Sequence, residues 1–297
     1  MKIGLFSVGA GRAAQPEVLV RLAQKAEEVG FESIFAPEHT VLFASDAYHS
    51  PYPYSADGKI TGMRADSNLL DPFLALAWAA AHTTHIRIGT GICLVPQRNP
   101  LITAKEVASL DILSGGRFIF GVGIGWLKEE FQALGVPPER RAARTREYVE
   151  AMKLLWTEAS PQFHGEFCEF QPVGSYPKPV QKPYPPILFG GESEPALRRS
   201  VEVGDGWLGF DVSPAEAGQA IDRMRQIAAE VGRDFASLDI SVSPYSKLPR
   251  VDLDSLKQYR DVGVQRVVLI NTTTRLEQID VALEEIGNTL VQPAQSL

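Results

Sequence analysis

Residues 118–131 read Phe-Ile-Phe-Gly-Val-Gly-Ile-Gly-Trp-Leu-Lys-Glu-Glu-Phe. An apolar strand pattern runs into glycines at positions 121, 123 and 125, and a helix-like start follows at Trp126. Glycine has no Cβ, so a planar ligand is able to approach its backbone closely. The alternative is a tight strand-to-helix turn without any ligand. This stretch alone leaves both interpretations open, and the surrounding chain decides between them.

The chain has 297 residues, of which 44% are hydrophobic and 22% charged, and its formal net charge is -7. This is the composition of a globular protein with a sizeable core. Barrels of alternating strands and helices reach such a length as one domain. The acidic balance and the lack of a Lys/Arg run argue against nucleic acid and against an anionic membrane surface as partners.

Targeting and redox signals are weak in this sequence. The start, Met1 to Phe6, has too short an apolar run for a signal peptide. Nowhere does an apolar run reach the roughly 18 residues that a transmembrane helix requires. Cys93 and Cys168 lie far apart and form no metal or redox motif. We therefore expect no membrane-spanning helix and a reduced, cytoplasmic setting.

Strand-like and helix-like stretches alternate along the whole chain, and this alternation predicts a parallel sheet. Eight such units over about 290 residues favour a closed (β/α)8 barrel over an open sheet, with residues 1–297 forming a single domain. The expected strands are 2–8, 33–36, 86–95, 118–125, 186–189, 206–210, 238–242 and 267–270. The expected helices are 16–29, 71–83, 101–113, 126–134, 139–156, 194–203, 214–231, 252–262 and 276–290.

Four helical stretches end in the dipeptide Val-Gly, at glycines 30, 204, 232 and 263. The position after a helix commonly takes a left-handed backbone conformation, which favours glycine. We therefore expect left-handed caps at all four, each followed shortly by a strand.

Two insertions interrupt the alternation. Residues 40–70, after the second strand, carry Tyr48, Tyr52 and Tyr54 among Ser, Pro, Asp and Gly, without a clear period. So long an irregular segment is usually an active-site lid or a disordered segment, and the three tyrosines favour a lid. Residues 158–185, before the fifth strand, are rich in Pro and aromatic residues and suggest a hairpin through 163–170.

In a (β/α)8 barrel the active site lies where the strands end. No lysine falls at these positions, which disfavours Schiff-base chemistry. Only Glu38, His39 and Asp211 are available as metal ligands, too few for a metal site. Glu38 and Asp211 also leave open a glycosidase pair, although nothing fixes their separation. A glycine-rich opening with one histidine best suits a large planar cofactor.

His39 is the strongest catalytic candidate, because imidazole exchanges protons near working pH. The alternative is a histidine that caps the strand end or anchors the next loop. His82 and His85 lie near the end of a helix, where imidazole caps carbonyl groups, so we expect structural roles for both.

Gly190 and Gly191 follow the fifth strand and precede a helix with Ser193 as cap and Pro195 in its first turn. Free backbone N–H groups at such a helix start bind phosphate, although an ordinary capped turn has the same sequence. Four arginines crowd another helix start, where they either reach an anionic cofactor or form ion pairs in solvent. They are Arg140, Arg141, Arg144 and Arg146.

Taken together, the chain resembles the luciferase-like monooxygenase superfamily, and within it the actinobacterial branch that uses the deazaflavin coenzyme F420. The resemblance extends over nearly the whole chain. Its marks are Pro37-Glu38-His39, Ile88-Gly89-Thr90-Gly91-Ile92, the 121–131 block, Gly190-Gly191 and Gly204-Asp205-Gly206-Trp207. Two positions depart from the branch, in which Asp often replaces Glu38 and an acidic residue often replaces Trp126.

The resemblance implies a flavin or deazaflavin ring at the barrel opening, and a homodimer. Trp126 then becomes the position that shapes the substrate site. The implied cofactor contacts are Glu38 and His39 beside the ring, a bulge at Gly91-Ile92 that often contains a cis peptide bond, Gly123 and Gly125 near the ring, Glu129 facing the polar chain, and Gly190-Gly191 at the phosphate.

The resulting hypothesis is hydride transfer between coenzyme F420 and a small organic substrate, with His39 exchanging a proton with the substrate oxygen. The cofactor carries the chemistry, and the barrel orients the reactants and excludes water. One alternative is a monooxygenase that uses reduced FMN. A second is a flavin-binding protein without catalytic activity.

Overall fold

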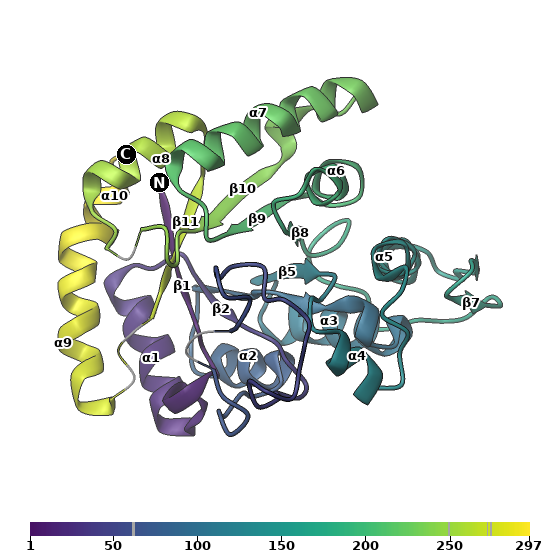
Figure 1. Ribbon diagram of the computed structural model, residues 1–297, viewed down its shortest axis with the longest axis horizontal. Coiled ribbons are helices and arrows are strands. Elements are labelled where there is room, and N and C mark those ends of the chain that lie inside the picture. Colours follow the sequence, from purple (N-terminus) through teal and green to yellow (C-terminus); the bar gives the residue numbers. More distant parts are fainter. Residues whose placement is uncertain (61–62, 249, 272, 274) are drawn as a thin grey trace.

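The computed structural model describes residues 1–60, 63–248, 250–271, 273 and 275–297, and eight parallel strands close into a barrel (Figure 1). Neighbouring strands follow the order β3, β2, β1, β11, β10, β9, β8, β5, and pairing of β3 with β5 closes the ring. The (β/α)8 barrel predicted from the sequence is confirmed. Its strands are β1 (Lys2–Phe6), β2 (Ser33–Ala36), β3 (Arg87–Thr90), β5 (Phe118–Gly123), β8 (Ile187–Gly190), β9 (Gly206–Phe210), β10 (Asp239–Ser243) and β11 (Arg266–Ile270).

Helices surround the strands (Figure 1), as expected when each crossover between parallel strands is helical. The first of them buries Val18, Leu22 and Ala26, three positions of the predicted apolar face. The helices are α1 (Pro16–Val29), α2 (Pro72–Ala81), α3 (Pro100–Leu113), α4 (Lys128–Ala133), α5 (Arg141–Thr157), α6 (Glu194–Glu202), α7 (Pro214–Val231), α8 (Leu253–Val262), α9 (Leu276–Ile286) and α10 (Gln292–Ala294). Short helical turns are η1 (Gly11–Ala14), η2 (Val95–Gln97), η3 (Phe235–Ser237) and the π-helical η4 (Gly287–Val291).

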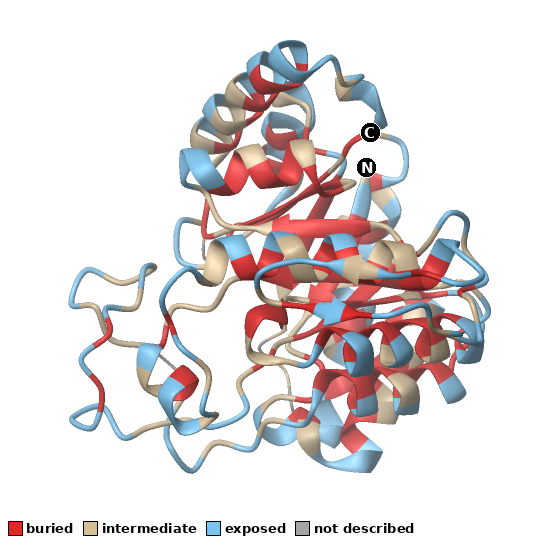
Figure 2. Ribbon diagram, turned by 90° about the vertical axis from the view of Figure 1, so that its right-hand side faces the viewer, coloured by how far each residue is buried: buried red, intermediate tan, exposed pale blue. Residues whose placement is uncertain are grey.

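The buried side chains form two groups. The larger group fills the space between strands and helices, and Figure 2 shows these buried residues on the strands and the inward helix faces. The smaller group fills the barrel interior with Phe35, Ile119, Leu188, Leu208 and Val268. The barrel is therefore a packed core rather than a pore, and a ligand has room only at its ends.

The third predicted strand, 86–95, is wrong in one respect, since the strand breaks in its middle. β3 ends at Thr90, the peptide bond between Gly91 and Ile92 is cis, and a short strand β4 (Cys93–Leu94) follows. The cis bond confirms what the family resemblance implied. The chain therefore bulges at this strand end, beside β5.

Three of the four predicted left-handed helix ends are confirmed, at glycines 30, 232 and 263. The fourth is wrong, because Gly204 does not adopt a positive φ. A Cβ at Gly204 would lie 2.7 Å from the Phe189 ring and 3.0 Å from the Ser200 carbonyl oxygen. Glycine is needed there for close packing against β8 and α6 rather than for a left-handed turn.

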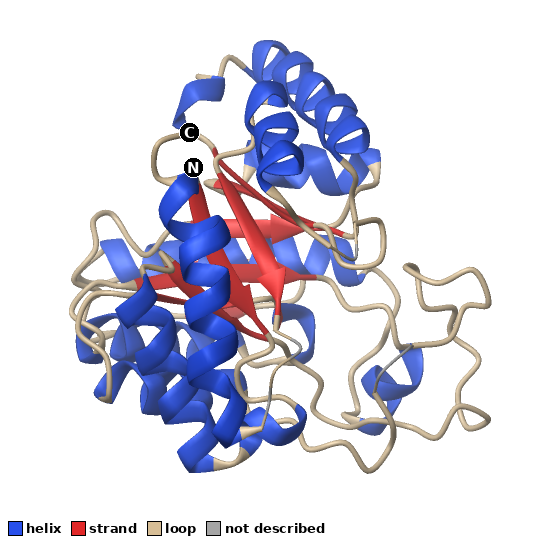
Figure 3. Ribbon diagram, turned by 90° about the vertical axis from the view of Figure 1, so that its left-hand side faces the viewer, coloured by secondary structure: helices blue, strands red, loops and turns tan. Residues whose placement is uncertain are grey.

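Both predicted insertions are present, and long connections gather beside one end of the strands (Figure 3). The hairpin consists of the antiparallel strands β6 (Phe163–His164) and β7 (Glu169–Phe170). The described part of the 40–70 loop contains turns and one bridge, from Leu69 to Ala10. Residues 61–62 of the predicted lid lie outside the described residues.

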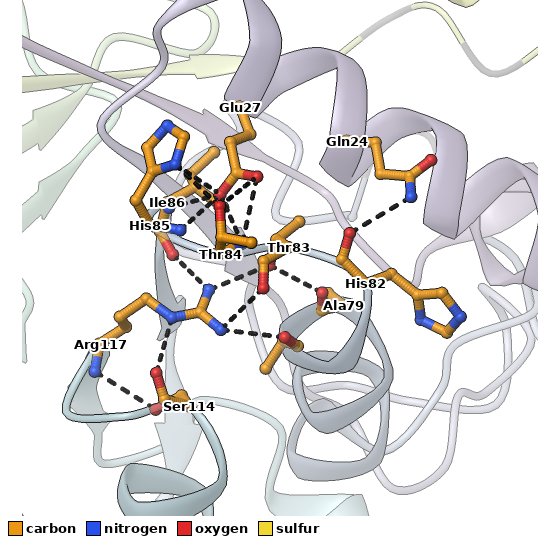
Figure 4. A network of polar contacts seen from close by, with 11 residues as sticks. Gln24, Glu27, Ala79, His82, Thr83, Thr84, His85, Ile86, Ser114 and Arg117 are labelled. Atoms are coloured by element: carbon orange, nitrogen blue, oxygen red, sulfur yellow. Dashed lines mark hydrogen bonds and ion pairs between the residues drawn. The ribbon is translucent and has the colours of Figure 1, made fainter.

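The structural roles expected for His82 and His85 are confirmed in the polar network between α2 and the start of β3 (Figure 4). His39, in contrast, follows the carboxyl end of β2. The Nδ1 atom of His82 lies 2.8 Å from the Trp78 carbonyl oxygen at the end of α2. His85 lies against Glu27, whose carboxylate accepts the His85 and Ile86 amides at 2.7 and 2.8 Å. These contacts fasten the turn between α2 and β3.

Candidate functional site

A cavity of about 960 Å³ opens at the carboxyl ends of the barrel strands. Its wall includes eight of the nine site residues predicted from the sequence. The ninth, Glu129, lies outside the lining. The eight are Glu38, His39, Gly91, Ile92, Gly123, Gly125, Gly190 and Gly191.

Ile92 forms a step in the floor of this cavity, and two of the glycines exist to make room for it. A Cβ built on Gly123 would lie 2.2 Å from Ile92 Cδ1, and one on Gly190 would lie 2.8 Å from the same atom. At Gly121 a Cβ would lie 1.9 Å from the Thr90 carbonyl oxygen. The glycines therefore accommodate the bulge at Gly91-Ile92, which places the apolar Ile92 side chain on the cavity wall, against the packed barrel interior. Their direct partner is the protein itself, which the sequence did not indicate.

His39 is held by a buried carboxylate that the sequence analysis missed. His39 Nδ1 lies 3.0 Å from Glu130 Oε2, and the Glu130 side chain is fully buried. Gln97 Nε2 donates to the same oxygen at 3.1 Å. Burial opposes ionisation of Glu130, but the hydrogen bonds from His39, Gln97 and the Val41 amide outweigh it and lower its pKa. The ionised carboxylate is thus a hydrogen-bond acceptor facing His39 Nδ1.

Glu38, the neighbour of His39, is tied to the protein from both sides. Arg98 Nε donates to Glu38 Oε1 at 2.7 Å, and the Leu94 amide donates to the other oxygen. Arg98 also pairs with Asp71 at 2.6 Å and with Glu106 at 3.2 Å. Glu38 therefore fixes the chain that follows the Ile92 bulge. It contributes the wall of the cavity, with both oxygens already hydrogen-bonded.

Glu129 fastens the 40–70 loop. Its carboxylate accepts the His49 amide at 2.7 Å, the Ser50 amide at 3.2 Å and the Ser50 hydroxyl at 2.6 Å. Burial works against ionisation, but the Ser50 hydroxyl and the two amides prevail and lower the pKa of Glu129 to about 2. The two adjacent carboxylates of α4 thus have different partners: Glu129 holds the 40–70 loop and Glu130 holds His39.

The end of the cavity near α6 is cationic. Arg199 and Arg141 both line it, together with Gly191 and Ser193 at the start of α6. Arg199 is 9% exposed, and its Nε has no hydrogen-bond partner among the described residues. Burial, and then the nearby Arg141, lower the pKa of Arg199. A buried guanidinium with an unbonded N–H beside another cation is unfavourable on its own, and a bound anion would stabilise it.

The helix start beside these arginines is open. Ser193, the residue before α6, makes no side-chain cap, and Gly191 has φ +102°. Glu194 in the first turn points away, because Arg223 binds it at 2.7 Å. Pro195 has no N–H, and the Ala196 and Leu197 amides donate to the Ser193 carbonyl at 2.8 and 3.0 Å, so the Glu194 amide is the donor that this helix start offers beside the two arginines.

The other arginines of the 140–146 group face elsewhere. Arg146 pairs with Glu150 and Glu202 at 3.1 and 2.7 Å, and Arg140 pairs with Glu166. Arg144 donates to the Pro137 carbonyl at 2.7 Å. Of the four, only Arg141 lines the cavity. Both predicted alternatives are thus present, divided among neighbouring residues.

Aromatic side chains of the 40–70 loop, together with Trp126 just before α4, cover the end of the cavity at His39. Trp126 meets His39, Tyr48 and Tyr52 edge-on, with ring centroids 6.0, 5.7 and 5.1 Å apart. Tyr54 continues the row, and its hydroxyl donates to Glu192 at 2.9 Å. The loop therefore faces the cavity with aromatic rings, while the carboxylates of Glu129 and Glu130 anchor it to α4.

The described residues of this region bear on two further chemistries, metal binding and glycoside hydrolysis. No cluster of three or more His, Cys, Asp or Glu side chains suited to a metal ion occurs among the described residues. Asp211, the other carboxylate of the sequence-based glycosidase alternative, accepts the Ser246 and Lys247 amides at 2.7 and 2.8 Å.

In the part of the chain that the structure describes, no helix is long and apolar enough to cross a membrane.

The parallel barrel thus carries at its strand ends a large cavity with a buried arginine and a hydrogen-bonded histidine, where barrel enzymes have their active sites. Residues 1–246 match the family model for the luciferase-like monooxygenases. The chain belongs to that family and is an oxidoreductase of the luciferase-like class.

Among the relatives of this chain, one is named for reduced FMN and another for coenzyme F420. An uncharacterized protein of Mycobacterium tuberculosis is 34% identical over 273 residues, 90% of this chain and 91% of its own. An FMNH2-dependent dimethylsulfone monooxygenase of Pseudomonas putida is 32% identical over 71% of this chain and 53% of its own. A putative coenzyme F420-dependent oxidoreductase of Mycobacterium tuberculosis is 29% identical over 73% of this chain and 58% of its own.

Solved structures share the fold over nearly the full length. An F420-dependent secondary alcohol dehydrogenase in complex with an F420-acetone adduct superposes with a TM-score of 0.76 at 18% identity, covering 99% and 98% of the two chains. The oxygenating constituent of 3,6-diketocamphane monooxygenase from Pseudomonas putida, in complex with FMN, gives a TM-score of 0.71 at 16% identity and 98% coverage of both. At such identities the likeness concerns the fold.

Proposed function

We propose that this protein transfers a hydride between coenzyme F420 and a small organic substrate. The observation that carries the proposal is the pairing of two features in one cavity. The apolar Ile92 side chain at the strand end suits one face of a tricyclic ring, and the vacant Nε of the buried Arg199 suits a phosphate. Bound F420 supplies a two-electron centre that gives or accepts the hydride.

The residues that would hold the cofactor are Ile92 beneath the ring and Gly191, Ser193 and Arg199 around the phosphate. Ser243 supports the same assignment, because its buried hydroxyl lines the cavity and has no partner among the described residues. A ring with polar atoms on one edge would satisfy it. Charge-assisted bonds from a buried guanidinium to phosphate are among the strongest in proteins.

F420 is favoured over FMN by the charges beyond the phosphate corner. Arg141 and the exposed Lys128 line the same cavity. Cations there suit the anionic tail that F420 carries beyond its phosphate, whereas in FMN the phosphate is terminal. The FMN alternative, a monooxygenase reaction, draws its support from the Pseudomonas putida relative.

His39 would move the proton that accompanies the hydride. Its Nδ1–H donates to the ionised Glu130, which leaves Nε2 for an oxygen of the substrate. In the direction of carbonyl reduction, Nε2–H gives its proton to the oxygen, and in alcohol oxidation Nε2 takes it. The aromatic loop keeps water from this pair, as a lid does.

The test is a titration of the purified chain with F420 and, separately, with FMN, followed by cofactor fluorescence. The proposal expects saturable F420 binding at micromolar or lower concentration, with turnover of F420 by at least one alcohol or carbonyl compound. Tight FMN binding without a response to F420 would transfer the proposal to the monooxygenase alternative. Binding of neither cofactor would reject both.

We also propose a homodimer that forms through α2 and α3. Exposed apolar side chains gather on these two neighbouring helices, with Leu74 73%, Trp78 50% and Ile102 60% exposed. Contiguous apolar surface on a folded chain usually marks an interface. Light scattering on the wild type and on Ile102→Glu tests this, and equal monomer masses for both would reject it.

The remaining expectations belong to the same proposal. Residues 1–297 act as one domain, because C-terminal strand β11 pairs with N-terminal β1. Both cysteines are free and buried, which supports a reduced, cytoplasmic setting.

A further inference from the structure

We propose that the substrate is an uncharged compound with an apolar ring and one carbonyl or hydroxyl oxygen, bound between the Ile92 step and the aromatic loop. This inference rests on the proposed function. It specifies the substrate class of the same cavity, which the sequence alone did not predict.

The first argument is a continuous row of rings over the cavity. Beyond Tyr52, the Tyr52 and Tyr54 centroids are 5.5 Å apart, Tyr54 and Phe210 are 4.9 Å apart, and Phe210 stacks on Tyr245 at 5.1 Å. All of these residues line the cavity. Edge-to-face rows present both ring faces and ring edges, the surfaces that planar apolar ligands contact best. A row of this length exceeds what a two- or three-carbon substrate is able to cover.

The second argument is that the carboxylates on the wall are already occupied. Glu38 accepts from Arg98 and from the Leu94 amide. Glu192 accepts the Tyr54 hydroxyl and, at 2.8 Å, the Phe210 amide. A cationic substrate would have to displace these internal donors, and stripping its own hydration would add to the loss.

The third argument is the charge of the cavity wall. Its cationic side chains are Arg199, Arg141 and Lys128. Arg141 Nε already donates to the Gly125 carbonyl at 3.0 Å, and the anionic phosphate and tail of the proposed cofactor would neutralise the charge of all three. An anionic substrate would therefore compete with the cofactor for the same cations, and burying it without one is costly. The remaining chemistry is that of a neutral ring compound with one oxygen at His39.

Three ketones separate these contributions. Acetophenone carries a ring and a carbonyl, acetone lacks the ring, and 4-acetylbenzoate adds a carboxylate to the same ring. Each is titrated into the cofactor-loaded protein, and the absorbance change of the bound cofactor reports binding. We expect acetophenone to bind at least about tenfold more tightly than acetone, because its ring buries more apolar surface. A similar margin of about tenfold is expected over 4-acetylbenzoate, whose charge is desolvated without a partner.

Variants at Tyr52 test the role of the rings. Tyr52→Ala should remove most of the preference for acetophenone over acetone, whereas Tyr52→Phe, which keeps the ring, should retain more of it. Equal affinity for the three ketones, or tightest binding of 4-acetylbenzoate, overturns the inference on the wild type alone. Cofactor binding is measured before the ketones are added. A protein that does not bind the cofactor contradicts the proposed function, whereas a protein that binds it without the expected ketone preference contradicts only the substrate class.

Discussion

The phosphate corner and the ring end of the cavity are built from different kinds of structure. The corner near Gly191 and Arg199 belongs to β8 and α6, regular elements whose backbone is fixed by the barrel. The end near His39 is closed by the 40–70 loop, which is attached by side chains, chiefly Glu129 and Glu130. Sites on regular elements are more rigid than sites on loops. The barrel therefore provides a preformed cofactor site, and the loop is the part that adapts to the substrate.

The barrel side should respond most strongly to substitution. In Gly121→Ala the new Cβ would lie 1.9 Å from the Thr90 carbonyl oxygen, and backbone there has no freedom to retreat. We expect a loss of roughly 3 kcal/mol or more in the free energy of unfolding, the range of severe core disruption. Urea denaturation measures it. Gly174→Ala is the matched control, since its nearest atom is 4.0 Å away. Equal stability of both variants would mean that the bulge is not rigid.

At the phosphate corner, Arg199→Ala should weaken cofactor binding by about tenfold to a hundredfold, the worth of a charge-assisted hydrogen bond. Its neighbour Arg198 supplies the control, because it pairs with Glu202 and Glu230 on the outer face of α6. Fluorescence titration of Arg199→Ala and Arg198→Ala gives both affinities. If the two variants bind the cofactor alike, the phosphate is held elsewhere.

At the ring end, Glu130→Gln should lower kcat by about tenfold or more, a part of the contribution that a well-placed acid–base group makes. Glu129→Gln, one residue earlier, should raise KM with a smaller effect on kcat, since it loosens the loop. A wild-type kcat in Glu130→Gln would remove Glu130 from the proposed proton transfer.

The smallest effect concerns pH and the loop. The pKa of Glu129 is lowered to about 2, below the unfolded value of about 4.3. Its stabilising bonds to His49 and Ser50 are therefore fully present above about pH 4.3 and are lost as the pH falls toward 2. Hydrogen exchange, corrected for intrinsic rates, should show these amides losing protection in that window. Glu129→Gln should flatten this dependence, and unchanged behaviour of the variant would assign the loop anchor to another group.

The same contrast explains what the sequence predicts. Alternating periodicity, together with helix starts such as Asp71-Pro72, predicted the barrel because each unit must bury an apolar face against the next. The break at Gly91-Ile92 was absent from the pattern, since it depends on Gly123 and Gly190 in other strands. Tertiary packing of this kind has no local signal.

The site was predicted less completely for a related reason. Neighbouring residues of a helix point about 100° apart, and α4 has six residues after an irregular turn, so its phase was not fixed. Glu130 was therefore missed in favour of Glu129. Arg199 was missed because arginine is seldom buried. Its place beside Val201 and Ala196 on the inward face of α6 was the one available clue.

A structure of the protein with bound F420, or with FMN if that is the cofactor that binds, tests the central claim most directly. The account predicts the ring over Ile92, with its phosphate within hydrogen-bond distance of Arg199 Nε and of the Glu194 amide at the start of α6. A phosphate bound away from Arg199, or a ring that does not contact Ile92, would contradict it.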